Sequence, residues 1–272
     1  MAKQGSVLFE LSIGQAGKIV VTEPAKKVYL LTFSSPPDNR LTTTFCKAIH
    51  LAFDIIQTNY PAGVVVTTSA VSKFYSNGLD LEHATSTPGF FSKTLYGLWH
   101  RILTYPMPTV ALVNGHAFAG GFMLAMMHDY RIMNPHRGFL CLNELALGVG
   151  LRPPMCGVFR EKVKATTFRR IILEVVRFKA LNALEEGLVD SLGDLEETLK
   201  FIGELDLVGK AQPGMSGQAV YGVLKREMYR ETVEYLERGD EEDARDLAIA
   251  EKQKREDLAR DERVAAWKKA KL

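Results

Sequence analysis

Up to residue 133, short runs of β-branched and other apolar residues alternate with longer stretches whose apolar residues recur at helical spacing. Strands are expected at 28–33, 63–68, 109–114 and 130–133, and helices at 42–57 and 90–103. Strands that alternate with helices in this order favour neighbouring parallel strands joined by right-handed crossovers. The pattern therefore predicts an α/β fold.

A glycine pair, Gly120-Gly121, stands at the head of an apolar segment in which no acid or base follows until His128. Glycine lowers helix propensity, so a core helix does not need such a pair at its start. Another glycine turn, at Gly78, follows the expected strand 63–68. A strand-to-helix junction leaves N–H groups unpaired, and a missing Cβ lets a ligand oxygen come close. Two such turns can aim two N–H groups at one carbonyl oxygen, which makes an oxyanion hole.

Composition excludes several other kinds of function. The 34 basic and 32 acidic residues are interspersed, so no basic stripe indicates a nucleic-acid partner. The longest apolar runs are shorter than the roughly 20 residues of a membrane span, and the N-terminus does not resemble a signal peptide. Three scattered cysteines, Cys46, Cys141 and Cys156, predict neither a disulfide framework nor a metal site.

Three motifs together resemble the crotonase (enoyl-CoA hydratase/isomerase) superfamily: SNGLDL at 76–81, NGHAFAGG at 114–121 and DYR at 129–131. The resemblance extends from about residue 28 to residue 190. It implies a crotonase-like ββα spiral with a C-terminal helical region. We accordingly expect an acyl-CoA-binding core over 1–195, a helical region with a charged tail over 196–272, and a homotrimer or a dimer of trimers.

The same resemblance implies the catalytic groups. The backbone N–H groups of Leu79 and Gly120 are expected to hold the thioester oxygen of an acyl-CoA. Hydratases of the family resemble a design with two carboxylates, but here the first of these positions is Met123 and only the second, Glu144, is acidic. A single base fits an isomerase, and the LNE motif at 142–144 resembles that of the delta-3, delta-2 enoyl-CoA isomerases. The segments FYSNG at 74–78, HDY at 128–130 and RGFL at 137–140 are most similar to the plant-type peroxisomal members. We expect neighbouring leucines to raise the pKa of Glu144 by desolvation, and we expect no cofactor, since CoA is part of the substrate.

The resemblance also implies further substrate-binding residues, and it leaves three possible functions for the protein. Asp80 is also a candidate helix cap, and His128-Asp129 is expected at the far end of the helix that begins at Gly120. Besides the isomerase, the alternatives are a hydratase, dehydratase or other acyl-CoA enzyme, and a non-catalytic acyl-CoA-binding subunit. The expected substrate-binding set is Arg40, Leu41, Ser76, Asn77, Gly78, Leu79, Asp80, Leu81, Gly120, Met123 and Asn143.

The last part of the chain is dominated by charge. From Gly239 onward acidic and basic residues alternate, which is typical of a solvated helix. The final residues, Ala270-Lys271-Leu272, resemble the peroxisomal address Ser-Lys-Leu. They predict recognition by the peroxisomal import receptor, a peroxisomal location and a role in fatty acid β-oxidation.

Overall fold

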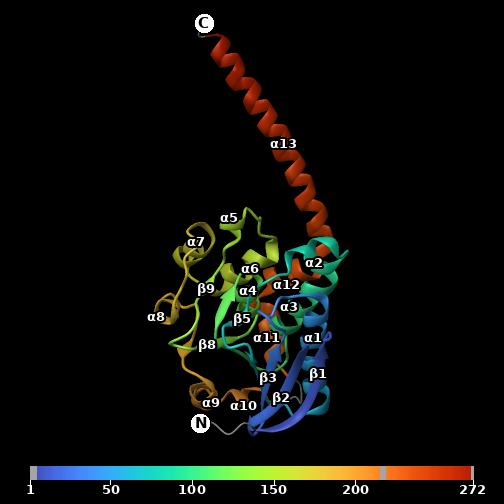
Figure 1. Cartoon of the computed structure of the whole chain (residues 1–272), viewed down its shortest axis with the longest axis vertical. Coiled ribbons are helices and arrows are strands. Elements are labelled where there is room, and N and C mark those ends of the chain that lie inside the picture. Colours follow the sequence, from blue (N-terminus) through green and yellow to red (C-terminus); the bar gives the residue numbers. More distant parts are fainter. Residues whose placement is uncertain (1–4, 215–218, 271–272) are drawn as a thin grey trace. The chain divides into compact units, whose positions relative to one another are not determined.

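The computed structural model describes residues 5–214 and 219–270, and it contains two β-sheets surrounded by helices (Figure 1). In the larger sheet β1, β2 and β3 pair antiparallel, and β3 begins a parallel series that continues through β4, β6, β8 and β10. The predicted α/β fold is confirmed. In spatial order the strands are β1 (Ser6–Ile13), β2 (Gly17–Ala25), β3 (Val28–Ser34), β4 (Val64–Ser69), β6 (Thr109–Val113), β8 (Tyr130–Met133) and β10 (Ser191–Leu192).

The smaller sheet consists of three short parallel strands, β5 (Phe74–Ser76), β7 (His116–Phe118) and β9 (Leu140–Cys141). Each follows a strand of the larger sheet, so that β4–β5, β6–β7 and β8–β9 form successive pairs, each followed by a helix. This repetition is the predicted ββα spiral. The residues just before the glycine turn at Gly78 form strand β5, which is not among the predicted strands.

Both faces of the larger sheet are covered. The central strands β4 and β6 are buried at every residue, and β-branched residues suit such a surface. Helices α1 (Thr43–Asn59), α3 (Tyr96–Leu103) and α4 (Gly120–Met126) contribute to the main hydrophobic core, which includes Val65 and Ala111 of the central strands. Helices α9 (Leu195–Glu204) and α10 (Leu207–Lys210) contribute to a second cluster, with Val66 and Val110.

Most predicted elements agree with the structure to within two residues, and the differences are local. The predicted strands begin at residue 28, whereas the structure adds β1 and β2 before it. The helix predicted at 90–103 begins with a π-helix, η1 (Phe90–Leu95). The remaining helices are α2 (Leu81–Ser86), α5 (Glu144–Leu147), α6 (Pro153–Lys162), α7 (Ala165–Leu173), α8 (Ala180–Glu185), α11 (Tyr221–Met228), α12 (Arg230–Glu237) and α13 (Gly239–Lys269).

The chain divides into two compact units, Met1–Glu237 and Arg238–Leu272. The boundary expected after residue 195 falls inside the first unit, at the start of α9, and as a domain boundary it stays a prediction. In the second unit α13 forms the predicted charged helix. Lys271 and Leu272 of the proposed targeting signal lie outside the described residues. None of the described helices combines the length and apolar character needed to cross a membrane.

Candidate active site

The two glycine turns meet at one end of the smaller sheet. They follow β5 and β7, which are adjacent and parallel, so their carboxyl ends lie together. Gly78 has a φ of +83°, and a Cβ added to it would lie 3.1 Å from the backbone nitrogen of Gly120. A side chain at Gly78 is thus opposed by backbone conformation and by the second turn. The expected juxtaposition of the turns is present.

Two backbone N–H groups are available at this junction. Gly120 is the first residue of α4, and the N–H of a first helical residue has no partner within its helix. Among the turn and loop hydrogen bonds of the described residues, neither Gly120 nor Leu79 donates its N–H to a backbone carbonyl. Both residues line the same cavity. The arrangement has the donors of an oxyanion hole, as the sequence predicts, although their catalytic role stays a prediction.

The paired glycines serve different purposes. A Cβ on Gly121 would lie 2.3 Å from the carbonyl oxygen of Ser76, so this glycine lets α4 pack against β5. A Cβ on Gly120 would instead lie 3.2 Å from Cδ2 of Leu79 and 3.3 Å from Cδ1 of Leu41. The close approach inferred from the pair is therefore made at Gly121 by the protein's own backbone. Only Gly120 borders the cavity.

Most of the predicted site residues surround a cavity of about 720 Å³. It extends from the glycine turns to α5 and α6. Those on its wall are Arg40, Asn77, Leu79, Leu81, Gly120, Met123, Asn143 and Glu144. Sequence reasoning did not assign to the site the other lining residues, Ala84, Thr85, Phe91, Ala119, Leu147, Val149, Gly150, Arg152 and Met155.

Four predicted binding residues are not on the cavity wall, and their contacts are structural. The Ser76 hydroxyl donates to the carbonyl of Asn39 at 2.7 Å. Asp80 caps α2 by accepting from the N–H of His83 at 3.0 Å, which confirms the capping alternative. Leu41 is fully buried, and its N–H donates to the carbonyl of Gly78 at 2.9 Å. These residues shape the turns behind the cavity.

Glu144 is the only carboxylate among the described residues that line the cavity. The residue is 9% exposed, and its Oε2 has no hydrogen-bond partner among the described residues. Burial raises the pKa of Glu144 to about 7, while the backbone N–H groups of Glu144 and Asn143 act in the opposite direction. The rise agrees with our expectation. Of the neighbouring leucines, Leu140 and Leu142 are buried, whereas Leu145 and Leu147 are 58% and 54% exposed and contribute little to the enclosure.

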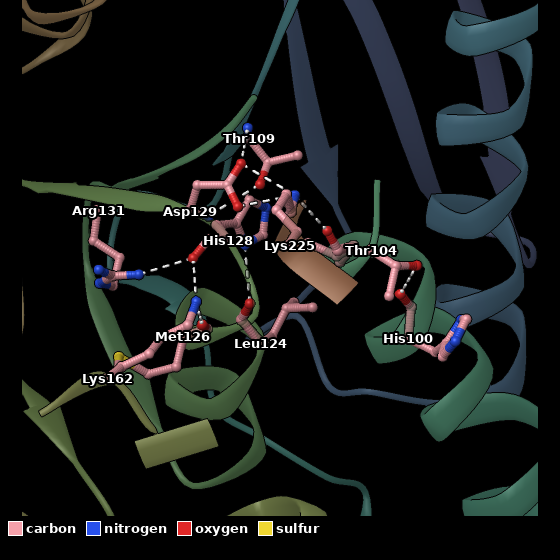
Figure 2. A network of polar contacts seen from close by, with 11 residues as sticks. His100, Thr104, Thr109, Leu124, Met126, His128, Asp129, Arg131, Lys162 and Lys225 are labelled. Atoms are coloured by element: carbon pink, nitrogen blue, oxygen red, sulfur yellow. Dashed lines mark hydrogen bonds and ion pairs between the residues drawn. The ribbon is translucent and has the colours of Figure 1, made fainter. Parts of the chain in front are cut away.

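His128 and Asp129 lie beyond the opposite end of α4, within a buried polar network (Figure 2). The carbonyl of Leu124 can only accept, so Nδ1 of His128 donates to it at 3.0 Å and Nε2 faces the Thr67 hydroxyl at 2.9 Å. Burial lowers the pKa of His128 to about 3, which keeps the ring neutral. Asp129 pairs with Lys225 at 2.9 Å. Neither residue lines the cavity, so the pair is structural, as expected.

The described residues contain no group of three or more His, Cys, Asp or Glu side chains that could hold a metal ion. Cys46, Cys141 and Cys156 are free thiols, and the first two are buried as small core residues.

Comparison with known proteins agrees with this architecture. Residues 23–245 match the family model described as enoyl-CoA hydratase/isomerase. The chain is 32% identical over 221 residues to "Enoyl-CoA delta isomerase 1, peroxisomal" of Arabidopsis thaliana, covering 78% of this chain and 90% of that protein. It is 26% identical over 185 residues to the human "Enoyl-CoA delta isomerase 1, mitochondrial", covering 66% and 61%.

Solved structures share the fold. An enoyl-CoA hydratase from Mycobacterium ulcerans superposes with a TM-score of 0.69 at 23% identity, covering 83% of this chain and 98% of that one. The human mitochondrial delta3-delta2-enoyl-CoA isomerase superposes with a TM-score of 0.66 at 20% identity, covering 87% and 98%. The family model matches most of the chain, and the two glycine turns lie together in its ββα spiral. The chain therefore belongs to the enoyl-CoA hydratase/isomerase family.

Proposed function

We propose that this enzyme is an enoyl-CoA delta isomerase that moves the double bond of a 3-enoyl-CoA to the conjugated 2-enoyl position. The observation that carries the proposal is that Glu144 is the single carboxylate among the described residues of the cavity wall, which it shares with Leu79 and Gly120. Met123 is also on the wall; by the resemblance to hydratases it stands at the position of their second acid, and its side chain cannot transfer a proton. The Arabidopsis relatives named enoyl-CoA delta isomerase support the same reaction.

The proposed mechanism uses one group as both base and acid. The Glu144 carboxylate removes a proton from carbon 2, and charge develops on the thioester oxygen. The N–H groups of Leu79 and Gly120 stabilise that enolate oxygen without giving up their protons. The protonated Glu144 then delivers the proton to carbon 4. A pKa of about 7 suits both steps, because the group is readily found in either form near neutral pH. The reaction moves one proton and one double bond, so it consumes no cofactor.

Activity is expected to depend on pH through Glu144. The free enzyme must hold the carboxylate ionised, and burial raises its pKa to about 7. The value of kcat/KM should therefore rise as pH increases through about 7 and level off about one unit higher. A glutamate at its ordinary pKa of 4.5 would instead give a flat profile there. Initial rates with one 3-enoyl-CoA between about pH 5.5 and 9 check this, and a flat profile would contradict it.

Product analysis separates the isomerase from its alternatives. Given trans-3-hexenoyl-CoA, the protein should form the conjugated 2-enoyl thioester, which is followed by its ultraviolet absorbance. Given 2-hexenoyl-CoA and water, it should form 3-hydroxyacyl-CoA far more slowly, because Met123 provides no second acid or base. Hydration faster than isomerisation would favour a hydratase. CoA binding without turnover of either substrate would favour a non-catalytic subunit.

Two further proposals concern the location and assembly of the protein. Relatives named as peroxisomal in Arabidopsis support a peroxisomal location and β-oxidation, whereas the human and rodent relatives carry mitochondrial names. Import through Ala270-Lys271-Leu272 and a homotrimer or dimer of trimers stay predictions. Imaging of an N-terminally tagged chain and the native mass in solution are the measurements that check them.

A further inference from the structure

Glu144 borders two hollows. Besides the 720 Å³ cavity, it lines a second one of about 180 Å³, and Val149 is common to both. We call the second hollow the Cys156 groove. Its lining residues come from the segment around α5 and from α6 and α7: Leu142, Glu144, Leu145, Val149, Leu151, Cys156, Ile172 and Leu173.

The Cys156 groove suits an alkyl chain. Apart from Glu144, its lining consists of aliphatic side chains and one thiol. Leu145 and Leu173 on its walls are 58% and 64% exposed. Apolar side chains grouped on one surface commonly mark a binding site, because covering them removes apolar area from water. The groove thus offers contacts to methylene groups, and among its described lining residues Glu144 alone carries a carboxyl group.

The proposed chemistry places the acyl chain beside this groove. A single carboxylate that serves carbons 2 and 4 must lie next to carbon 3. In the proposed mechanism the thioester oxygen binds to the N–H groups of Leu79 and Gly120, which line the same cavity as Glu144. The chain beyond carbon 4 therefore leaves the reacting atoms close to Glu144, where the second hollow begins.

We propose that the Cys156 groove receives the acyl chain of the substrate beyond carbon 4, and that Cys156 sets the length of chain accepted. This inference rests on the proposed isomerase function. Its ligand is a straight alkyl tail, so the enzyme prefers medium- or long-chain 3-enoyl-CoAs to the shortest ones. Each methylene taken from water into the groove favours the longer substrate by about fourfold in kcat/KM.

Cys156 offers a direct way to change the groove. The residue belongs to α6, is partly exposed and is a free thiol. Cys156→Phe fills space in the groove, whereas Cys156→Ala enlarges it. These substitutions should move chain-length selectivity in opposite directions, which a general loss of stability would not do.

The measured quantity is the ratio of kcat/KM for trans-3-dodecenoyl-CoA to that for trans-3-hexenoyl-CoA. We expect Cys156→Phe to lower this ratio at least tenfold and Cys156→Ala to keep or raise it, with thermal unfolding confirming that both variants fold. If the wild type turns over both substrates but Cys156→Phe leaves the ratio within twofold, the inference is wrong. If Cys156→Phe changes the native mass of the protein but not the ratio, a second copy of the chain covers the groove. That result would also overturn the inference. Failure of the wild type to isomerise either substrate would refute the proposed function instead.

Discussion

Glu144→Gln is expected to lower kcat for isomerisation of a 3-enoyl-CoA by at least about 100-fold, the usual scale for loss of a general acid–base group. Glutamine keeps the shape of the side chain but can neither take the proton from carbon 2 nor return it to carbon 4. The cavity has no other carboxylate among its described lining residues to replace it. Steady-state rates with trans-3-hexenoyl-CoA measure the effect.

A matched control is Glu82→Gln, which removes an exposed carboxylate in the first turn of α2 and should leave kcat within about twofold, as is usual for surface substitutions. Turnover of Glu144→Gln close to that of the wild type would assign the base to another residue. Asp80 would be tested next, although the structure shows it capping α2.

Glu144→Gln should also be more stable towards unfolding than the wild type in alkaline solution. Burial raises the pKa of Glu144 from 4.5 to about 7, so the folded protein holds this proton more tightly than the unfolded chain. That contribution to stability is fully present below about pH 4.5 and is lost as pH rises through about 7. Glutamine has no such loss, and the gain is at most about 3 kcal/mol. The difference in Tm between variant and wild type should be larger at about pH 8.5 than at about pH 5.

Gly120→Val is expected to lower kcat/KM by at least about 100-fold, the scale reported for loss of one oxyanion-hole donor. A Cβ at this position already lies 3.2 Å from Leu79 and 3.3 Å from Leu41, and the two methyl groups of valine need more room. The Leu79 side chain must then give way, and the valine methyl groups crowd the space around the two N–H donors. Kinetic measurements should show the loss while circular dichroism shows a folded protein.

The control for this variant is Gly97→Val. Gly97 lies in α3, and a Cβ added there meets no atom within 4 Å, so activity should stay close to that of the wild type. Gly121→Val would be uninformative as a control, because its Cβ would lie 2.3 Å from the carbonyl oxygen of Ser76 and would disturb the fold. Equal kinetics for Gly120→Val and the wild type would contradict the assignment of backbone donors.

Local patterns in the sequence were enough to predict many of the strands and helices. A run such as VVVTT needs only its own residues to be recognised as a buried strand, and β4, β6 and β8 were predictable for that reason. Strands β7 and β9 contain only three and two residues, too few for a period to be read. They exist because each pairs with its neighbours in the smaller sheet.

What the sequence by itself determined is the chemistry available: two glycine turns after strands, one acid at Glu144 and an apolar residue at Met123. Only the tertiary structure decided which residues share the cavity, because its wall is assembled from loops and helices far apart in the chain, such as those carrying Phe91 and Met155. It also decided that Gly121 is required by packing, and that the pKa of Glu144 is raised although its adjacent residue Leu145 is exposed. Close approach and desolvation depend on atoms from several elements at once, and no local pattern records them.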